Sequence, residues 1–410
     1  MYKSIRELSK LYAELAHSSA QEEKRRLWKD LNSFRFYQPP ILARKIPFHE
    51  FFDFSIIKSE DPLLRQIEIE LATCVFFRQK LKDDYIFDPW VKVRSKFTGD
   101  ENYRWGVPCK LGEQVMAYGA AAFMPPIREE EDIIKIKPLE CEIDEKATRE
   151  NIEKVEEALG GNLEVISDRQ GIFCTMWNRD ISTDLAKLRG LEQMMWDVYD
   201  RPEWLHRFIS LMQDTILKDI DKTEKMNNFC LCNNENYGGP YCDELPIPDS
   251  GSNTCKAKEL WSFFSAQEFT AIGPDLYNDF MLSYQIPIME RFGLIAYGCC
   301  EDITSKIPLL KKVKNLRRIS ITPSSDVRKC AEQIGKDYVI SYRPNPTDMI
   351  AHGLNEDLVR KIVKRDFEIL KENKCIFDVT LKDVETIANK PENMIRWVDI
   401  VRQIGDEVYN

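Results

Sequence analysis

The chain has 410 residues, of which 43% are hydrophobic and 31% charged, and its formal net charge is −10. This composition is typical of a globular protein with ample core material, and the negative charge argues against a general nucleic-acid binder, which needs clustered Lys and Arg to contact phosphates. No apolar run reaches the length of a membrane span and the first residues lack the apolar segment of a signal peptide, so we expect a cytoplasmic protein without nucleic-acid or membrane partners.

The first 150 residues predict an irregular, mostly helical region. Apolar residues from Leu8 to Leu15 keep helical spacing, and a second helical stretch runs over 63–81. The acid-rich segment 128–150 resembles a solvated connection. We therefore predict a helical extension over 1–150, packed on a second domain over 151–410.

In the second domain, strand-like and helix-like segments alternate. Pro202 predicts the start of one helix, and Asp326 and Asn355 predict the N-caps of two others. Alternation with short connections implies a parallel sheet. Seven expected strands, with an eighth unassigned in the N-terminal half, predict an α/β fold of the closed (β/α)₈ TIM-barrel type; an open doubly wound sheet is the alternative. The expected strands cover 171–177, 228–233, 260–265, 293–297, 316–321, 338–341 and 375–381.

Two thiols and a carboxylate follow the expected strand at 293–297. Cys299, Cys300 and Glu301 place soft and hard metal ligands side by side, and in a barrel the residues after each strand meet at one end. Thiolate and carboxylate donors suit Zn²⁺, so we predict a zinc site formed by Cys299, Glu301 and Glu235. The alternative is that both cysteines are small residues in a tight turn.

Other polar residues after the expected strands complete the predicted site. Histidines avoid these positions, so a histidine-based nucleophilic triad is not expected. Trp177 is assigned to the core. The predicted catalytic residues are Glu268, Tyr297 and Asp383, and the predicted substrate-binding residues are Asn234, Tyr237, Gln267, Arg343 and Lys382.

An ordered set of motifs resembles the uroporphyrinogen decarboxylase superfamily. The segment M-W-D-V-Y-D-R-P-E at 195–203, followed by His206, resembles the helix pair M-x-D-x-Y-D-x-P-E…H of that superfamily. The segment Y-G-C-C-E-D at 297–302 stands where the superfamily has H-x-C-G-D, and P-E-N at 391–393 resembles the start of its last helix. The similarity covers roughly residues 160 to 405, in order.

The resemblance implies a barrel with its site at the carboxyl ends of the strands, and two chemistries. True uroporphyrinogen decarboxylases use no cofactor and bind substrate carboxylates through an N-terminal R-Q-A-G-R segment; here Arg44-Lys45 is the nearest basic pair. The corrinoid methyltransferase branch takes zinc ligands from H-x-C and a later cysteine. In this chain Tyr297 stands at the histidine, Cys299 matches the first cysteine, and the later position falls near Asp383 or Glu385.

We therefore expect a methyltransferase that moves a methyl group from a small methylated substrate to a corrinoid carried by a partner protein, with zinc as the Lewis acid. The alternative is a cofactor-independent decarboxylase of an aromatic or heterocyclic carboxylic acid, in which Arg343 binds the departing carboxylate and Glu268, Asp383 or Tyr297 supplies the proton. A non-enzymatic corrinoid-binding protein is a third option. The expected partners are a small methylated or carboxylated molecule, a small corrinoid protein and, optionally, a second copy of the chain.

Overall fold

The fold is built around a curled sheet of six parallel strands in the order β1-β10-β9-β8-β7-β6. The computed structural model describes residues 4–44, 46–113, 121–231, 233, 235–248 and 254–409. The strands of this sheet are β1 (Ile41–Ala43), β6 (Trp261–Phe264), β7 (Leu294–Tyr297), β8 (Leu316–Ile321), β9 (Val339–Tyr342) and β10 (Ile376–Leu381).

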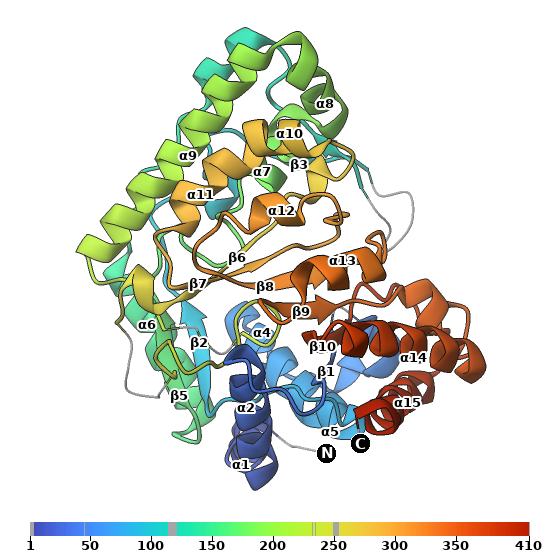
Figure 1. Ribbon diagram of the computed structural model, residues 1–410. Helices are drawn as coiled ribbons and strands as arrows, with labels where there is room; N and C mark the ends of the chain where they lie inside the picture. Colours follow the sequence, from blue (N-terminus) through green and yellow to red (C-terminus); the bar gives the residue numbers. More distant parts are fainter. Residues whose placement is uncertain are drawn as a thin grey trace.

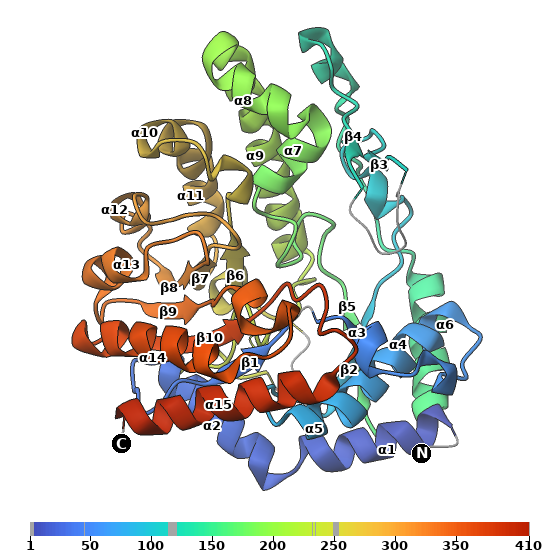
Figure 2. The ribbon, with the colours of Figure 1, turned by 90° about the vertical axis from the view of Figure 1, so that its right-hand side faces the viewer.

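Helices cover the outer side of this sheet, which explains the near-continuous apolar runs of its strands. Every residue of β6, β7, β9 and β10 is buried, as expected for a parallel sheet packed on both faces. Figure 1 shows α11 beside β6 and β7, and α14 and α15 beside β10. Figure 2 shows α12, α13 and α14 on one side of the sheet, with α3, α4, β2 and β5 across from it.

The sheet forms a half-barrel, and the described residues do not close it. Strands β2 (Trp90–Arg94) and β5 (Glu164–Asp168) pair with each other in a separate parallel sheet, and β3 (Lys110–Leu111) and β4 (Phe123–Met124) form a short antiparallel pair. The predicted alternation and parallel sheet are confirmed, whereas a full (β/α)₈ barrel is not. Strand β1 comes from the predicted N-terminal extension, so that segment contributes an edge strand to the sheet.

Two of the predicted strands are wrong. Residues 171–177 form turns, and the described residues of 228–233 are irregular. The backbone explains the first case: the N–H of Gly171 donates to Thr223 Oγ1 at 3.2 Å and the N–H of Phe173 donates to Asp219 Oδ2 at 2.8 Å. These amides bond to side chains of a helix, so they are not available to a neighbouring strand.

The predicted helix starts at Asp326 and Asn355 are confirmed, because the side chain of each residue caps its helix. Asp326 accepts the N–H of Lys329 at 3.0 Å and Asn355 accepts the N–H of Leu358 at 3.1 Å, as N-caps do. The helices are α1 (Ile5–Ala16), α2 (Ser19–Asn32), α3 (Phe48–Phe51), α4 (Pro62–Ala72), α5 (Gln79–Leu81), α6 (Glu145–Leu159), α7 (Ser182–Arg189), α8 (Leu191–Asp200), α9 (Pro202–Lys225), α10 (Pro274–Tyr277), α11 (Ser283–Met289), α12 (Ile307–Leu310), α13 (Val327–Ile334), α14 (Glu356–Glu372) and α15 (Pro391–Tyr409).

A buried ion pair joins two strands inside the half-barrel. Arg318 of β8 lies 2.5 Å from Asp378 of β10, and both side chains are almost fully buried. Arg318 also donates to Asn32 Oδ1 at 2.7 Å, while Ser341 and Thr380 donate to Asp378. The pair is therefore satisfied by further hydrogen bonds, which is the condition under which a buried ion pair is tolerated.

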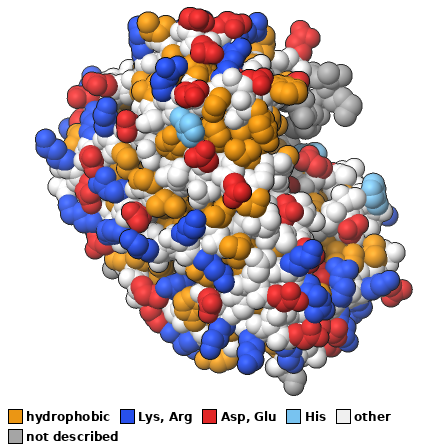
Figure 3. All heavy atoms as spheres, turned by 45° about the horizontal axis from the view of Figure 1, so that its top comes forward, with side chains coloured by type: hydrophobic (Ala, Val, Ile, Leu, Met, Phe, Trp, Pro, Cys, Tyr) orange, Lys and Arg blue, Asp and Glu red, His pale blue; other side chains and the backbone are white. Residues whose placement is uncertain are grey.

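The surface mixes charges of both signs. Figure 3 shows Lys and Arg side chains interspersed with Asp and Glu over the face that it presents. Large hydrophobic side chains are also exposed on α8 and on the β3–β4 pair, among them Phe123, Met124, Leu191, Trp196 and Tyr199. Within the described part of the chain, no helix combines the length and the apolar composition needed to cross a bilayer.

Candidate functional site

The carboxyl ends of the sheet strands bring thiols and cationic side chains together. Because all six strands run parallel, the residues that follow them meet at one edge of the sheet. Cys299 and Cys300 follow β7, Arg343 follows β9, and Lys382 follows β10. Gly298 allows β7 to turn here, because its φ of +105° is one that a residue with a side chain rarely adopts.

The buried ammonium of Lys382 faces both thiols. Lys382 Nζ lies 3.1 Å from Cys300 Sγ and 3.7 Å from Cys299 Sγ, and the two sulfur atoms are 3.6 Å apart. Lys382 is only 5% exposed, and it also forms an ion pair with Asp383. The hydrogen bond from Cys299 and the charge of Lys382 together lower the pKa of Cys300 to about 6, although partial burial acts against this. Cys300 is thus set up as an exposed, easily ionised thiol.

Glu301 holds the loop that carries the thiols. Its Oε2 accepts the backbone N–H groups of Cys299 at 2.7 Å and Cys300 at 3.0 Å, and its Oε1 accepts the N–H of Ala266 at 2.8 Å. The side chain is 1% exposed. The Glu301 carboxylate is therefore occupied by backbone amides of two neighbouring strand ends. Its predicted role as a zinc ligand stays a prediction.

A cluster of aromatic and cationic side chains adjoins the thiols. The Arg343 guanidinium lies 4.4 Å from the centre of the Tyr237 ring, and the Arg44 guanidinium lies 4.6 Å from the same centre and 5.1 Å from that of Trp177. Arg44 forms an ion pair with Glu235. The cluster brings together predicted substrate-binding residues, Tyr237 and Arg343, with a predicted metal ligand, Glu235.

Arg44 and Trp177 belong to this cluster and were not among the predicted site residues. The assignment of Trp177 to the core is wrong, because its side chain is 42% exposed and lines a cavity. Arg44 directly follows β1, and a three-residue strand is too short for its sequence alone to reveal. A basic residue after the apolar run Ile41–Ala43 was the available signal.

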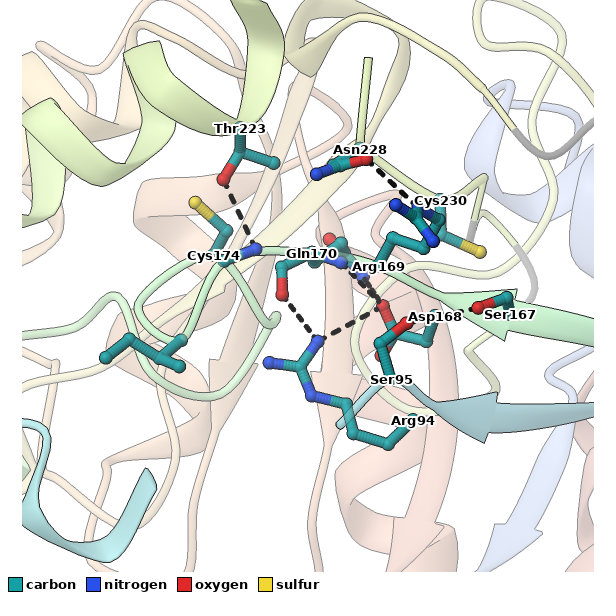
Figure 4. Close-up of polar contacts among 12 residues, drawn as sticks. Arg94, Ser95, Ser167, Asp168, Arg169, Gln170, Cys174, Thr223, Asn228 and Cys230 are labelled. Atoms are coloured by element: carbon teal, nitrogen blue, oxygen red, sulfur yellow. Dashed lines mark hydrogen bonds and ion pairs between the residues drawn. The ribbon is translucent and has the colours of Figure 1, made fainter. Parts of the chain in front are cut away.

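A cavity of about 280 Å³ lies next to the cluster. It shares Trp177 and Glu235 with the cluster and is also lined by Glu70, Lys92 and Asp168. Figure 4 shows one of its borders, where Arg94 of β2 reaches Asp168 and the backbone carbonyl of Gln170 beyond β5. The volume accommodates a small organic molecule beside the strand ends.

A larger cavity lies away from the strand ends. It has a volume of about 490 Å³ and lies between α9 and the segment 138–143. Arg169, Thr223 and Asn228, which Figure 4 labels, are among its lining residues. Neither Cys299 nor Cys300 lines this cavity, so it is separate from the thiol site although it is the larger of the two cavities.

Other predicted site residues are turned toward different partners. The Tyr297 hydroxyl bonds to the Tyr277 hydroxyl at 2.6 Å and donates to Gln285 Oε1 at 3.1 Å, and burial raises the pKa of Tyr297. Glu268 accepts from Ser182 Oγ at 2.5 Å and from Gln267 Nε2 at 3.2 Å. The structure thus does not bring the predicted catalytic residues into one cluster: Asp383 lies at the thiols, whereas Tyr297 and Glu268 contact helices and turns that flank β6 and β7.

Asn234 lies outside the described residues, as does Lys45 of the basic pair. The other predicted substrate-binding residues, Tyr237, Gln267, Arg343 and Lys382, are all described.

The arrangement of the described residues does not fit a zinc ion. Nowhere in the described ranges do three or more His, Cys, Asp or Glu side chains gather as metal ligands would. The sulfur atoms instead contact the Lys382 ammonium, whose positive charge disfavours a metal cation at the same place. Glu235 pairs with Arg44 and not with a second ligand-type side chain among the residues that the structure describes.

Comparisons with known proteins show the fold and do not show a family. No protein-family model matches the sequence, and no curated protein matches it. A methyltransferase from Methanosarcina mazei superposes with a TM-score of 0.51 at 9% identity, over 94% of this chain and 99% of that one. An intracellular xylanase from Thermoanaerobacterium saccharolyticum covers 84% of this chain and 85% of its own length, at 14% identity and a TM-score of 0.25. The chain therefore shares its overall fold with the methyltransferase, whereas the superposition on the xylanase is too poor to carry an argument.

Proposed function

We propose that this protein is a methyltransferase that moves a methyl group from a small methylated molecule to a corrinoid presented by a partner protein. The observation that carries the proposal is the buried Lys382 ammonium, 3.1 Å from the Cys300 thiol at the carboxyl ends of the strands. The likeness in fold to a methyltransferase is consistent with it.

The chemical demand of the reaction is to stabilise the leaving group. When the bond between the methyl carbon and its oxygen, nitrogen or sulfur breaks, the electron pair stays on that heteroatom. A proton supplied in the transition state lowers the barrier. The corrinoid of the partner would supply the nucleophile, and no step here needs a resident metal.

Among the residues at this edge, Lys382 is the best-placed proton donor. Its ammonium has three N–H groups, and its known contacts are the two thiols and Asp383. A substrate heteroatom placed beside Cys300 would therefore be within hydrogen-bonding reach of an ammonium N–H. Asp383, whose Oδ2 is 3.7 Å from Cys300 Sγ, keeps the ammonium charged and oriented.

The test uses free cobalamin reduced to the cobalt(I) state as methyl acceptor. Wild-type protein is incubated with methanol, methylamine, dimethyl sulfide or para-methoxybenzoate, and loss of the cobalt(I) absorption is followed. We expect one of these donor classes to react, and Lys382→Met to slow that reaction about a hundredfold. Lys364→Met, at an exposed position of α14 where the ammonium pairs with Glu407, is the matched control. If no donor reacts in wild type, or Lys382→Met is as fast as the control, the proposal is wrong.

One observation favours a second function, a cofactor-independent decarboxylase. Arg343 is buried and forms no ion pair with a carboxylate of the described residues, which suits a substrate that carries its own carboxylate. In that reaction the bond between the carboxyl carbon and the neighbouring carbon breaks and carbon dioxide leaves. The neighbouring carbon keeps the electron pair and takes up a proton. Release of carbon dioxide from carboxylic acids without cobalamin would favour this function over methyl transfer.

A further inference from the structure

Arg343 is a buried cation that lacks an anionic partner among the described residues. Its side chain is 2% exposed, and Nη1 donates to the backbone carbonyls of Gly298 at 3.1 Å and Cys299 at 2.5 Å. Its Nε is buried and makes no hydrogen bond. Carbonyl oxygens satisfy part of the guanidinium but do not neutralise it, and buried charges in proteins are normally paired.

Tyr237 presents a second unsatisfied group at the same place. Its side chain is 6% exposed, and its hydroxyl is buried without a hydrogen-bond partner. The ring lies beneath the Arg343 guanidinium, 4.4 Å from ring centre to guanidinium carbon. Nearly all buried hydroxyl groups are hydrogen-bonded, so two orphaned donors in contact point to an absent acceptor.

The charges around these two groups define what that acceptor is. Arg44 is paired with Glu235, and Lys382 is paired with Asp383. Arg343 is thus the one of these three cations that pairs with no carboxylate of the described residues, and the ionised Cys300 thiol lies against Lys382. A guanidinium N–H and a phenol O–H together match the two oxygens of a carboxylate, whereas a phosphate dianion would need a second free cation.

We propose that the substrate of this site is a small carboxylic acid whose carboxylate accepts hydrogen bonds from Arg343 Nε and the Tyr237 hydroxyl. The inference rests on the proposed function, since it names the class of methyl donor: a methylated or methoxylated carboxylic acid. Arg343 contacts the backbone of Cys299, and Lys382 contacts the thiols of Cys299 and Cys300, so the methyl-bearing end of a bound acid would lie beside Lys382.

The experiment compares acids with their neutral amides by calorimetric titration. The probes are methoxyacetate and para-methoxybenzoate, each with its amide, which keeps the shape and removes the charge. We expect wild type to bind at least one acid at least tenfold more tightly than its amide. Tyr237→Phe should weaken binding of that acid about tenfold and leave binding of the amide unchanged.

Tyr237→Phe also separates recognition from folding. Because the hydroxyl has no partner in the protein, its removal should not lower the melting temperature. Tyr199→Phe, on the exposed face of α8, is the matched control and should change neither binding nor stability. Arg343→Gln should abolish the preference for acid over amide; Tyr237→Phe keeps the test decisive if Arg343→Gln fails to fold.

The outcomes distinguish this inference from the proposed function. If no acid binds more tightly than its amide, or if Tyr237→Phe binds the acid as wild type does, the carboxylate site is refuted. If the acids bind as expected but donate no methyl group to cobalt(I) cobalamin, the site stands and the proposed function falls. If only neutral donors transfer a methyl group, the proposed function stands and the carboxylate site is refuted.

Discussion

Replacing Glu301 by Gln tests whether this residue holds the thiol loop or binds a metal. The carboxylate accepts three backbone N–H groups, two on Oε2 and one on Oε1. In Glu301→Gln the amide oxygen can keep the N–H groups of Cys299 and Cys300. The amide nitrogen, a donor, then faces the N–H of Ala266, so one charge-assisted hydrogen bond is lost and two donors are buried against each other.

The size of the effect follows from these contacts. Loss of a hydrogen bond to a charged group, together with burial of an unsatisfied donor, costs about 3 kcal/mol of the free energy of unfolding. Surface substitutions away from such contacts change stability by about 0.5 kcal/mol or less. Glu332→Gln, on the exposed face of α13, is the matched control.

Urea unfolding followed by tryptophan fluorescence and by circular dichroism provides the assay. We expect the midpoint of Glu301→Gln to fall well below that of wild type, with or without a chelator, and the midpoint of Glu332→Gln to stay in place. An unchanged midpoint in Glu301→Gln, coupled with loss of bound metal, would refute the assignment of Glu301 to the backbone and support its role as a metal ligand.

Three further predictions concern the core, the metal and the thiols. Asp378→Asn leaves Arg318 charged and unpaired between β8 and β10, so it should destabilise the protein by about 3 to 5 kcal/mol in urea unfolding; a loss below about 1 kcal/mol would contradict this. Metal analysis after dialysis should find equally little zinc in wild type and in Cys299→Ser. The predicted zinc site would instead be supported if wild type held one zinc ion per chain and the variant held none. Alkylation of Cys300 by iodoacetamide, read by peptide mass spectrometry, should rise with pH around pH 6, because the thiolate is the reactive form. In Lys382→Met the rise should shift to higher pH, since the charge that favours the thiolate is gone; an unshifted profile would show that Lys382 does not act on the thiol.

Local sequence determined the elements whose signals lie within a few residues. Asp326 and Asn355 cap their helices as predicted, because a side-chain acceptor and the amide three residues later need no distant partner. The apolar strands from β6 to β10 were recognisable because a parallel sheet buried on both faces demands continuous hydrophobic runs. Residues after these strands were therefore predictable as candidates for the site.

Tertiary structure decided which apolar segments pair and where each polar side chain points. The segment 171–177 resembles a strand, but its amides bond to Thr223 and Asp219 of α9, which lie some 50 positions away in the sequence. Tyr297 is the last residue of β7 and Cys299 follows two residues later, yet the Tyr297 hydroxyl bonds to Tyr277 and the Cys299 thiol lies near Lys382. Sequence patterns encode burial and local capping; the partner of a buried hydroxyl, thiol or carboxylate depends on contacts between distant segments, which only the folded chain brings together.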